Sequence, residues 1–175
     1  MLIIDNVIIM CIMAKLNILT FPDPRLRKVA ARVTIFDKSL ENLTSDMLET
    51  MYAENGIGLA ATQVDFHERI IVIDVSDDRN EPLIFINPEF KILNDKSLLS
   101  FSEGCLSVPG VIEEITRPDS IFLTWQDITG QHHEEEPSGL LTVCIQHEID
   151  HLEGKLMVDY LSPLKRDRIR RKATK

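Results

Sequence analysis

Cysteine is scarce in this chain of 175 residues, which has only three: Cys11, Cys105 and Cys144. So few cysteines do not form the disulfide framework that small secreted domains use to compensate for a limited core. The count favours a reducing compartment, in which free thiols persist, and we expect a cytoplasmic protein.

Long hydrophobic runs are also missing, so the sequence predicts no transmembrane helix and no membrane partner. The first 14 residues are apolar, but they carry Asp5, lack a basic start and precede no small-residue cleavage site, unlike a secretory signal. They are not rich in Arg or Ser, unlike a transit peptide. We expect residues 1–14 to be an extension outside the fold, with Met10 and Met13 as alternative starts.

Internal repeats, low-complexity segments and interdomain linkers are absent as well. A chain of this length fits one domain with a sizeable core, so residues 15–175 are expected to form a single domain. With 44% hydrophobic and 27% charged residues, the composition is typical of an ordinary globular protein.

Charge is distributed unevenly along the chain. The net charge is −9, but Lys165–Lys175 has seven basic residues and one acidic residue, so this tail is +6 and the rest is −15. A basic tail on an acidic body is typical of a segment that contacts a polyanion. It is equally typical of a helix end whose cations interact favourably with the helix dipole.

Hydrophobic periodicity predicts an α+β fold, with short antiparallel sheets packed around a central helix and one further helix towards each end of the chain. Apolar residues three and four apart predict the first helix over Lys38–Asn55, after a helical turn that begins at Asp23-Pro24. β-rich runs predict strands at Arg69–Val75, Pro82–Phe90, Leu98–Phe101, Ile112–Thr116, Ser120–Gln126 and Gln131–Glu136.

The segment Gln146–Gly154 contains the pattern H-E-x-x-H. His147 and His151 are four residues apart, so on a helix both side chains can face one ion, and Glu148 can transfer a proton beside it. The helix is expected to begin after Ser138 as N-cap and to end at Gly154, and apolar residues on most of its sides predict burial. Buried His and Glu need partners, which a metal would provide; hydrogen-bonded core histidines are the alternative.

Catalytic sites of the zinc type usually have three protein ligands and one open position, and several residues are candidates for the third ligand. Cys105 lies in a Gly-Cys loop that permits close approach, and its thiolate would be a strong ligand. Cys144 is more typical of packing. Downstream acidic residues lack the long helical spacing of thermolysin-like proteases, and the remaining histidines lie in a polar strand typical of a surface; these candidates are Glu153, Asp159, His132 and His133.

The run Gly56–Val64 combines small residues with a single amide, Gln63. Its two glycines allow the backbone to approach a ligand or another strand closely, although many tight turns have the same composition. Because the run has no lysine and follows no strand, it does not indicate a phosphate-binding loop.

Three segments of the chain together resemble the signature motifs of peptide deformylases, in the order of that family. They are Gly56-Ile57-Gly58-Leu59-Ala60-Ala61-Thr62-Gln63, Glu103-Gly104-Cys105-Leu106-Ser107 and Gln146-His147-Glu148-Ile149-Asp150-His151-Leu152. The resemblance extends from about Ile18 to the C-terminus and is closest to the bacterial type with a C-terminal helix. It implies a hydrolase that removes the formyl group from the N-formylmethionine of newly made polypeptides and releases formate.

The resemblance also implies the roles of the site residues. The metal ligands would be Cys105, His147 and His151, with water in the fourth position, and Glu148 would transfer the proton. The native ion would be Fe²⁺, with Zn²⁺, Ni²⁺ or Co²⁺ as replacements, whereas the ligand set alone suggests zinc. The groups that bind the formyl oxygen and the substrate main chain would be the Gln63 side chain, the Leu106 backbone N–H and the Gly58 backbone.

The family resemblance further implies a pocket for the methionine side chain and an ion pair that fixes the Cys105 loop. The ion pair would join Glu103 to Arg117. At position 112 this chain has isoleucine, where some members of the family carry a basic residue near the later residues of the substrate. The basic tail Lys165–Lys175 would form a helix that docks on ribosomal RNA. The pocket would be lined by Ile57, Phe101, Leu140, Val143, Cys144 and His147.

Two alternatives to a deformylase are compatible with part of the sequence. The H-E-x-x-H pattern also occurs in metalloproteases that cleave peptide bonds, but Cys105 and the other two motifs argue against that reading. A purely structural metal could tie the helix to the Cys105 loop, yet a closed structural site would need neither Glu148 nor Gln63.

Overall fold

The computed structural model describes residues 15–173, so the extension expected at residues 1–14 lies outside the described part of the chain. Its α-helices are α1 (Lys38–Ala53), α2 (Gly139–Leu152) and α3 (Pro163–Ala173). Short 3₁₀ helices occur at η1 (Pro24–Arg27), η2 (Ala61–Val64) and η3 (Met157–Tyr160). The strands are β1 (Gly58–Ala60), β2 (Ile70–Ile73), β3 (Leu83–Ile92), β4 (Leu98–Gly104), β5 (Ile112–Pro118), β6 (Ile121–Gln126) and β7 (His132–Glu135).

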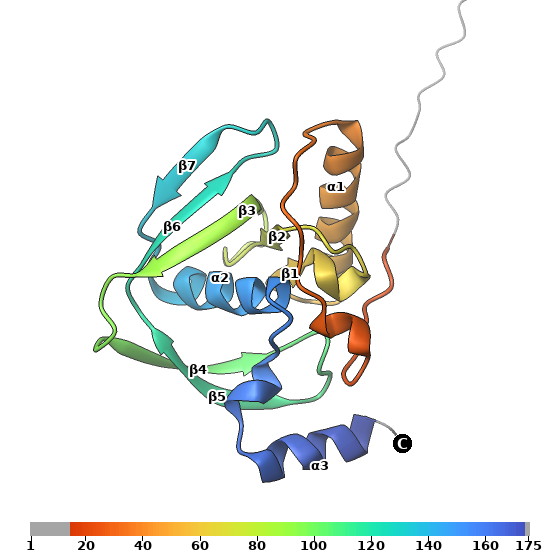
Figure 1. Cartoon of the computed structure of the whole chain (residues 1–175), viewed down its shortest axis with the longest axis vertical. Helices are drawn as coiled ribbons and strands as arrows, with labels where there is room; N and C mark the ends of the chain where they lie inside the picture. The colour runs from red at the N-terminus through yellow and green to blue at the C-terminus, as the bar shows by residue number, and fades with distance from the viewer. Residues whose placement is uncertain (1–14, 174–175) are drawn as a thin grey trace, which may run out of the picture.

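Helix α2 occupies the centre of the fold, as the sequence predicts (Figure 1). A five-stranded antiparallel sheet in the order β1-β2-β3-β6-β7 lies on one side of it, and the β4-β5 hairpin lies on the other. Helix α1 covers the opposite face of the five-stranded sheet, and α3 lies beyond β5. The α+β prediction is confirmed.

Strand β2 explains how the two main helices are held. Its four residues are all buried, because both faces of the sheet are covered there. Ile71 and Ile73 pack in the cluster that contains α2, whereas Ile70 and Val72 pack in the cluster that contains α1. This alternation follows from the two-residue period of a strand, and it fixes α2 against the sheet.

The ends of α2 follow the sequence only in part. Gly154 adopts a φ of 69°, the left-handed conformation that stops a helix at low cost for glycine. Ser138 occupies the N-cap position, as predicted, but its side chain makes no capping hydrogen bond. Helix α1 is capped by Asp37, whose carboxylate accepts from the N–H groups of Ser39 and Leu40.

Two expectations for local structure need correction. The composition of Gly56–Val64 favours a tight turn, but the run forms the short strand β1 and the 3₁₀ helix η2. The strand forms because β1 pairs with β2. His133 is half-buried, stacks on Trp125 and contacts Asp127, so it is not the simple surface residue that a polar strand suggests. Within residues 15–173, no helix is long and apolar enough to cross a membrane.

Candidate active site

The end of α2 and the end of β4 bring three potential metal ligands together. His147 and His151 are one helical turn apart, and Cys105 follows the last residue of β4. The candidate ligand atoms of these three residues all lie within 4.8 Å of one another, and Cys105 Sγ is 3.2 Å from His151 Nε2. Cys105 lies 42 positions before His147 and 46 before His151 in the sequence, and the fold brings the three residues together.

Buried contacts orient the first histidine. Glu103 accepts a hydrogen bond from His147 Nδ1 at 2.8 Å, which leaves Nε2 available to an ion. Glu103 also forms a bidentate ion pair with Arg117, whose Nε lies 2.6 Å from Oε1 and Nη2 3.0 Å from Oε2. The Glu103 and Arg117 side chains are 5% and 3% exposed, so this pair fixes the hairpin that carries Cys105.

The network around Arg117 extends further than the sequence indicated. Arg117 Nη1 donates to Asp150 Oδ2 at 2.9 Å, and its guanidinium lies 4.9 Å from the centre of the Tyr160 ring. Tyr160 in turn donates its hydroxyl to Asp150. Neither Asp150 nor Tyr160 was singled out as a support of the site, although both lie in segments that resemble the deformylase pattern.

The pKa values of the two histidines are shifted in opposite directions by their surroundings. Burial, reinforced by the positive charges of His147 and Arg117, holds the pKa of His151 well below its usual value, so its ring is neutral and can bind a cation. Burial also lowers the pKa of His147, but its contacts with Cys105 and Glu103 outweigh that effect and raise the pKa. Metal binding would therefore displace a proton from His147.

The three residues fit a divalent metal. In a tetrahedral site with Cys and His ligands, sulfur and nitrogen are roughly 3.5 Å apart, close to the separation of Cys105 Sγ and His151 Nε2. The His151 Nδ1 and Glu148 Oε2 atoms are buried and have no hydrogen-bond partner within residues 15–173. A dry core would not retain such groups without a ligand or water nearby.

Glu148 lies beside this group with its carboxylate almost completely buried. Burial raises the pKa of Glu148 to about 7, and a bound cation would lower it again by attraction. A carboxylate with a pKa near neutrality is suited to accept and return a proton during hydrolysis.

The amide of Gln63 is held in a fixed orientation on η2. Its Oε1 accepts from the Ala60 N–H at 2.8 Å, and its Nε2 donates to Ser107 Oγ at 3.1 Å. The same Nε2 lies 3.7 Å from Cys105 Sγ, so the amide nitrogen faces the ligand group. The Leu106 N–H has no hydrogen-bond acceptor in the described part of the chain. Ser107, which the sequence did not assign a role, sets the amide orientation.

A cavity of 610 Å³ is lined by two of the candidate metal ligands, Cys105 and His147. Gly58, Gln63 and Glu148 line it, and so do all six residues expected to form a side-chain pocket: Ile57, Phe101, Leu140, Val143, Cys144 and His147. Leu140 remains 40% exposed at its rim. The cavity lining therefore combines apolar side chains with a small number of polar groups, which is usual for a small-ligand site.

Strand β1 brings the backbone of Gly58 close to helix α2. A Cβ atom added to Gly58 would lie 2.8 Å from Cys144 Sγ and 3.0 Å from Glu148 Cδ. Arg79 supports the segment before β1, since its Nη2 donates a hydrogen bond to the Gly56 carbonyl at 2.6 Å. Glycine is thus required at position 58 by close approach of the backbone to α2, and not by a tight turn.

The remaining ligand candidates lie elsewhere or contact other groups. Glu153 pairs with Arg69, and Asp159 pairs with Arg27. His132 is exposed on β7. Cys144 is buried between α2 and β1, where burial raises its pKa well above the usual value, and it keeps its proton as a packing residue does.

Comparisons with known proteins agree with this geometry. The family model of polypeptide deformylase matches residues 15–167. Peptide deformylases from Hahella chejuensis and Pseudomonas aeruginosa are 58% and 56% identical over 163 residues, which cover 93% of this chain and 96% of each relative.

Solved structures agree as well. A peptide deformylase from Legionella pneumophila superimposes with a TM-score of 0.85 at 45% identity and covers 92% of this chain and 94% of its own. The peptide deformylase from Ehrlichia chaffeensis in complex with actinonin gives a TM-score of 0.88 at 39% identity, covering 93% and 97%. The chain belongs to the polypeptide deformylase family, metallohydrolases that remove the formyl group from newly made polypeptides.

Proposed function

We propose that Cys105, His147 and His151 hold one divalent metal and that the formylated end of the substrate binds in the adjoining cavity. The convergence of the three ligand atoms within 4.8 Å supports this assignment most directly. A bound divalent cation would supply Lewis acidity, lowering the pKa of water and polarising the formyl carbonyl. By family resemblance the native ion is Fe²⁺, and Zn²⁺, Ni²⁺ or Co²⁺ can replace it.

Glu148 acts as the general base and then as the general acid. It takes a proton from the attacking water as the new C–O bond forms at the formyl carbon. It returns that proton to the amine nitrogen as the C–N bond breaks, so that formate and a free amino terminus leave. Its unpartnered Oε2 and its position on the cavity wall support this role.

The formyl oxygen gains negative charge during attack and needs donors that are already in place. The Gln63 amide and the Leu106 N–H provide them in this proposal. The bonds that Ala60 and Ser107 make to Gln63 hold its amide before substrate arrives, so little reorganisation is required.

The methionine side chain occupies the apolar part of the cavity, between Ile57 and Phe101 on one side and α2 on the other. Leu140, Val143, Cys144 and His147 provide the α2 wall. The unbranched side chain of methionine suits a pocket without a charged group at its end, and the Gly58 backbone can hydrogen-bond the substrate main chain.

Formate release from formyl-Met-Ala-Ser tests the assignment. The metal-loaded protein should release formate, and Glu148→Ala should lower kcat by about 10²- to 10⁴-fold while elemental analysis finds an unchanged metal content. An active Glu148→Ala variant would contradict the role of that residue. Elemental analysis after anaerobic purification tests the identity of the native ion, since finding zinc in place of iron would contradict Fe²⁺.

We also propose that the basic tail contacts the ribosome, in the cytoplasm where formylated chains are made. Arg170 and Arg171 lie on exposed positions of α3, and the tail carries a net +6 on an acidic protein. Arg170→Gln with Arg171→Gln should weaken co-sedimentation with ribosomes at low salt, whereas Lys91→Gln on exposed β3 should not. Unchanged co-sedimentation of the double variant would contradict this role.

A further inference from the structure

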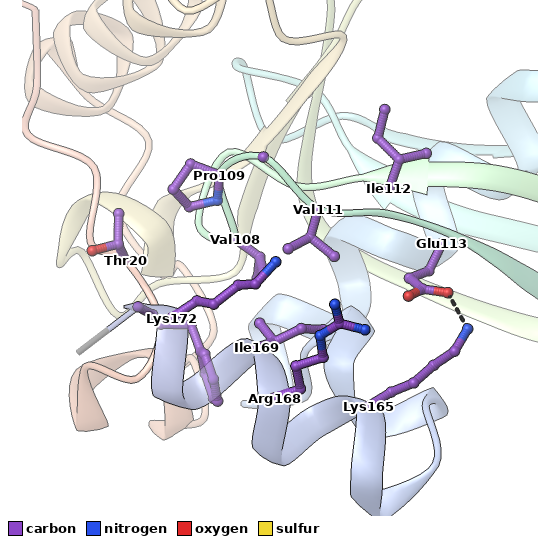
Figure 2. A pocket seen from close by; sticks show the side chains of 13 residues that line it. Thr20, Val108, Pro109, Val111, Ile112, Glu113, Lys165, Arg168, Ile169 and Lys172 are labelled. Carbon is purple, nitrogen blue, oxygen red and sulfur yellow. Dashed lines mark hydrogen bonds and ion pairs between the residues drawn. The ribbon is translucent and has the colours of Figure 1, made fainter. Parts of the chain in front are cut away.

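A second cavity lies across the loop that borders the active-site cavity. It has a volume of 510 Å³ and lies between the loop at residues 108–113 and helix α3 (Figure 2). We call it the basic groove. Its apolar side includes Val108, Val111 and Ile169, and its α3 side carries Lys165, Arg168 and Lys172.

The positive charges of the basic groove are only partly compensated. Lys165 Nζ lies 2.6 Å from Glu113 Oε2, so this cation is paired at one end of the groove (Figure 2). Arg168 and Lys172 have no ion-pair partner within residues 15–173, and both are exposed. They stand four residues apart on α3, where like charges destabilise a helix slightly. An anionic ligand between them would remove that repulsion.

The basic groove is adjacent to the active-site cavity. Pro109, Gly110, Val111 and Ile112 line both of them, so one short stretch of loop forms the wall between the two. Ile112 is 74% exposed and presents an apolar surface on this wall. A polypeptide held by its formyl end in the first cavity can cross this wall and continue into the second.

We propose that the basic groove binds the downstream part of the polypeptide substrate and favours acidic side chains there, through Arg168 and Lys172. This rests on the proposed function, because it places the formylated end in the neighbouring cavity. The groove thereby acts as a specificity element for sequences beyond the residues next to methionine.

The shape and chemistry of the groove favour a peptide over a nucleic acid as its occupant. A peptide offers aliphatic surface to Val111 and Ile169 and carboxylates to the two free cations. The phosphates of a nucleic acid would gain nothing from the apolar side of the groove. Single-stranded bases usually stack on aromatic rings, whereas the apolar residues named here are aliphatic. Arg170 and Arg171 do not line the groove, so they remain accessible to a polyanion.

Formyl peptides of two lengths test the proposal. The short substrate is formyl-Met-Ala-Ser, and the long ones extend it by a flexible Gly-rich segment that carries either Glu or Gln at matched positions. We expect kcat/KM to be about three- to tenfold higher for the Glu peptide, with kcat unchanged, since exposed charge pairs change an equilibrium constant by up to about fivefold each. The preference should disappear at high salt.

Variants assign the preference to the groove. Arg168→Gln with Lys172→Gln should abolish it and leave the cleavage of formyl-Met-Ala-Ser unchanged. Arg170→Gln with Arg171→Gln, which removes the same charge from the same helix, should retain it. Reversal of charge with Arg168→Glu and Lys172→Glu should favour a Lys-containing peptide.

The outcomes separate this proposal from the one on which it rests. Equal kcat/KM for the Glu and Gln peptides, with normal cleavage of formyl-Met-Ala-Ser, would overturn the groove as a peptide site. If the wild type shows no preference for the Glu peptide and the Arg168→Gln, Lys172→Gln variant co-sediments less with ribosomes, the groove binds RNA instead. No formate from any substrate would overturn the proposed function first.

Discussion

Replacing Gly58 with alanine measures how closely β1 must approach the Glu148 carboxylate, the proposed general base. The φ of Gly58 is not in the left-handed region, so the backbone can accept alanine without strain of its own. The added Cβ, however, would lie 2.8 Å from Cys144 Sγ and 3.0 Å from Glu148 Cδ, and nearer still to Glu148 Oε1. The change therefore acts through contact with the α2 side chains.

The size of the effect follows from the displacement that the new methyl group requires. Non-bonded carbon contacts are favourable at about 3.5–4.0 Å, so the carboxylate of Glu148 must retreat by on the order of 0.5–1 Å. A misplacement of about 1 Å at a reacting group can lower a rate by about 10²-fold. We expect kcat for formate release from formyl-Met-Ala-Ser to fall by about 10- to 100-fold, with overpacking costing about 1–3 kcal/mol of stability.

Gly56→Ala is the matched control. A Cβ added there would be 2.7 Å from the Cδ1 end of the Leu106 side chain, which can rotate away, and 3.4 Å from the Met51 carbonyl. Its kcat should stay within about threefold of the wild type, because only the end of the Leu106 side chain needs to move and the Leu106 N–H and Glu148 stay in place. Removing the sulfur with Cys144→Ala in the Gly58→Ala background should not restore activity, because Glu148 would still be displaced. A Gly58→Ala enzyme with wild-type kcat would refute the reasoning.

Three further predictions concern stability, pH and metal. Arg117→Leu leaves the buried Glu103 carboxylate without its ion-pair partner and should lower the free energy of unfolding by about 3–5 kcal/mol in urea titrations, whereas Arg166→Leu, at an exposed ion pair, should lower it by less than about 1 kcal/mol. Burial raises the pKa of Asp159, but hydrogen bonds from Arg27 and the Leu156 N–H outweigh it and hold that pKa below its usual value. Its stabilising effect is therefore present above the unfolded pKa of about 4 and lost as the pH falls through the folded pKa, so Asp159→Asn should be less stable than wild type at neutral pH and equally stable in acid. Chelation should abolish formate release and lower the melting temperature reversibly, and an unchanged melting temperature would contradict a metal held by three buried or half-buried ligands.

Much of the candidate metal site could be predicted because its chemistry depends on local spacing. A four-residue separation places His147 and His151 on one helix face wherever the helix lies. The assignment of Cys105 as third ligand required the family resemblance, since Glu153 and Asp159 were also near in sequence. Only the fold shows that those two are engaged by Arg69 and Arg27 instead.

The supports of the site were harder to foresee because they depend on long-range contacts. Arg117 was expected to pair with Glu103, but its contacts with Asp150 and Tyr160 join β5 to α2 and η3. No periodicity in the sequence marks such a junction. The strand formed by Gly58–Ala60 is similar, since it becomes a strand through pairing with β2 and carries no strand-forming composition of its own.

The loop at Pro109–Ile112 shows why a surface property can depend on tertiary structure. In sequence it is a turn between β4 and β5, and α3 begins about 50 residues later. Ile169 packs with Val108 in one apolar cluster, and that contact brings the cations of α3 to the far side of the loop. Cys105 lies in the same connection between β4 and β5, directly after the end of β4. Because one segment borders both cavities, a change in α3 that moves the loop would alter catalysis as well as substrate preference. Neutralising Arg168 and Lys172, which leaves Ile169 in place, separates these two effects.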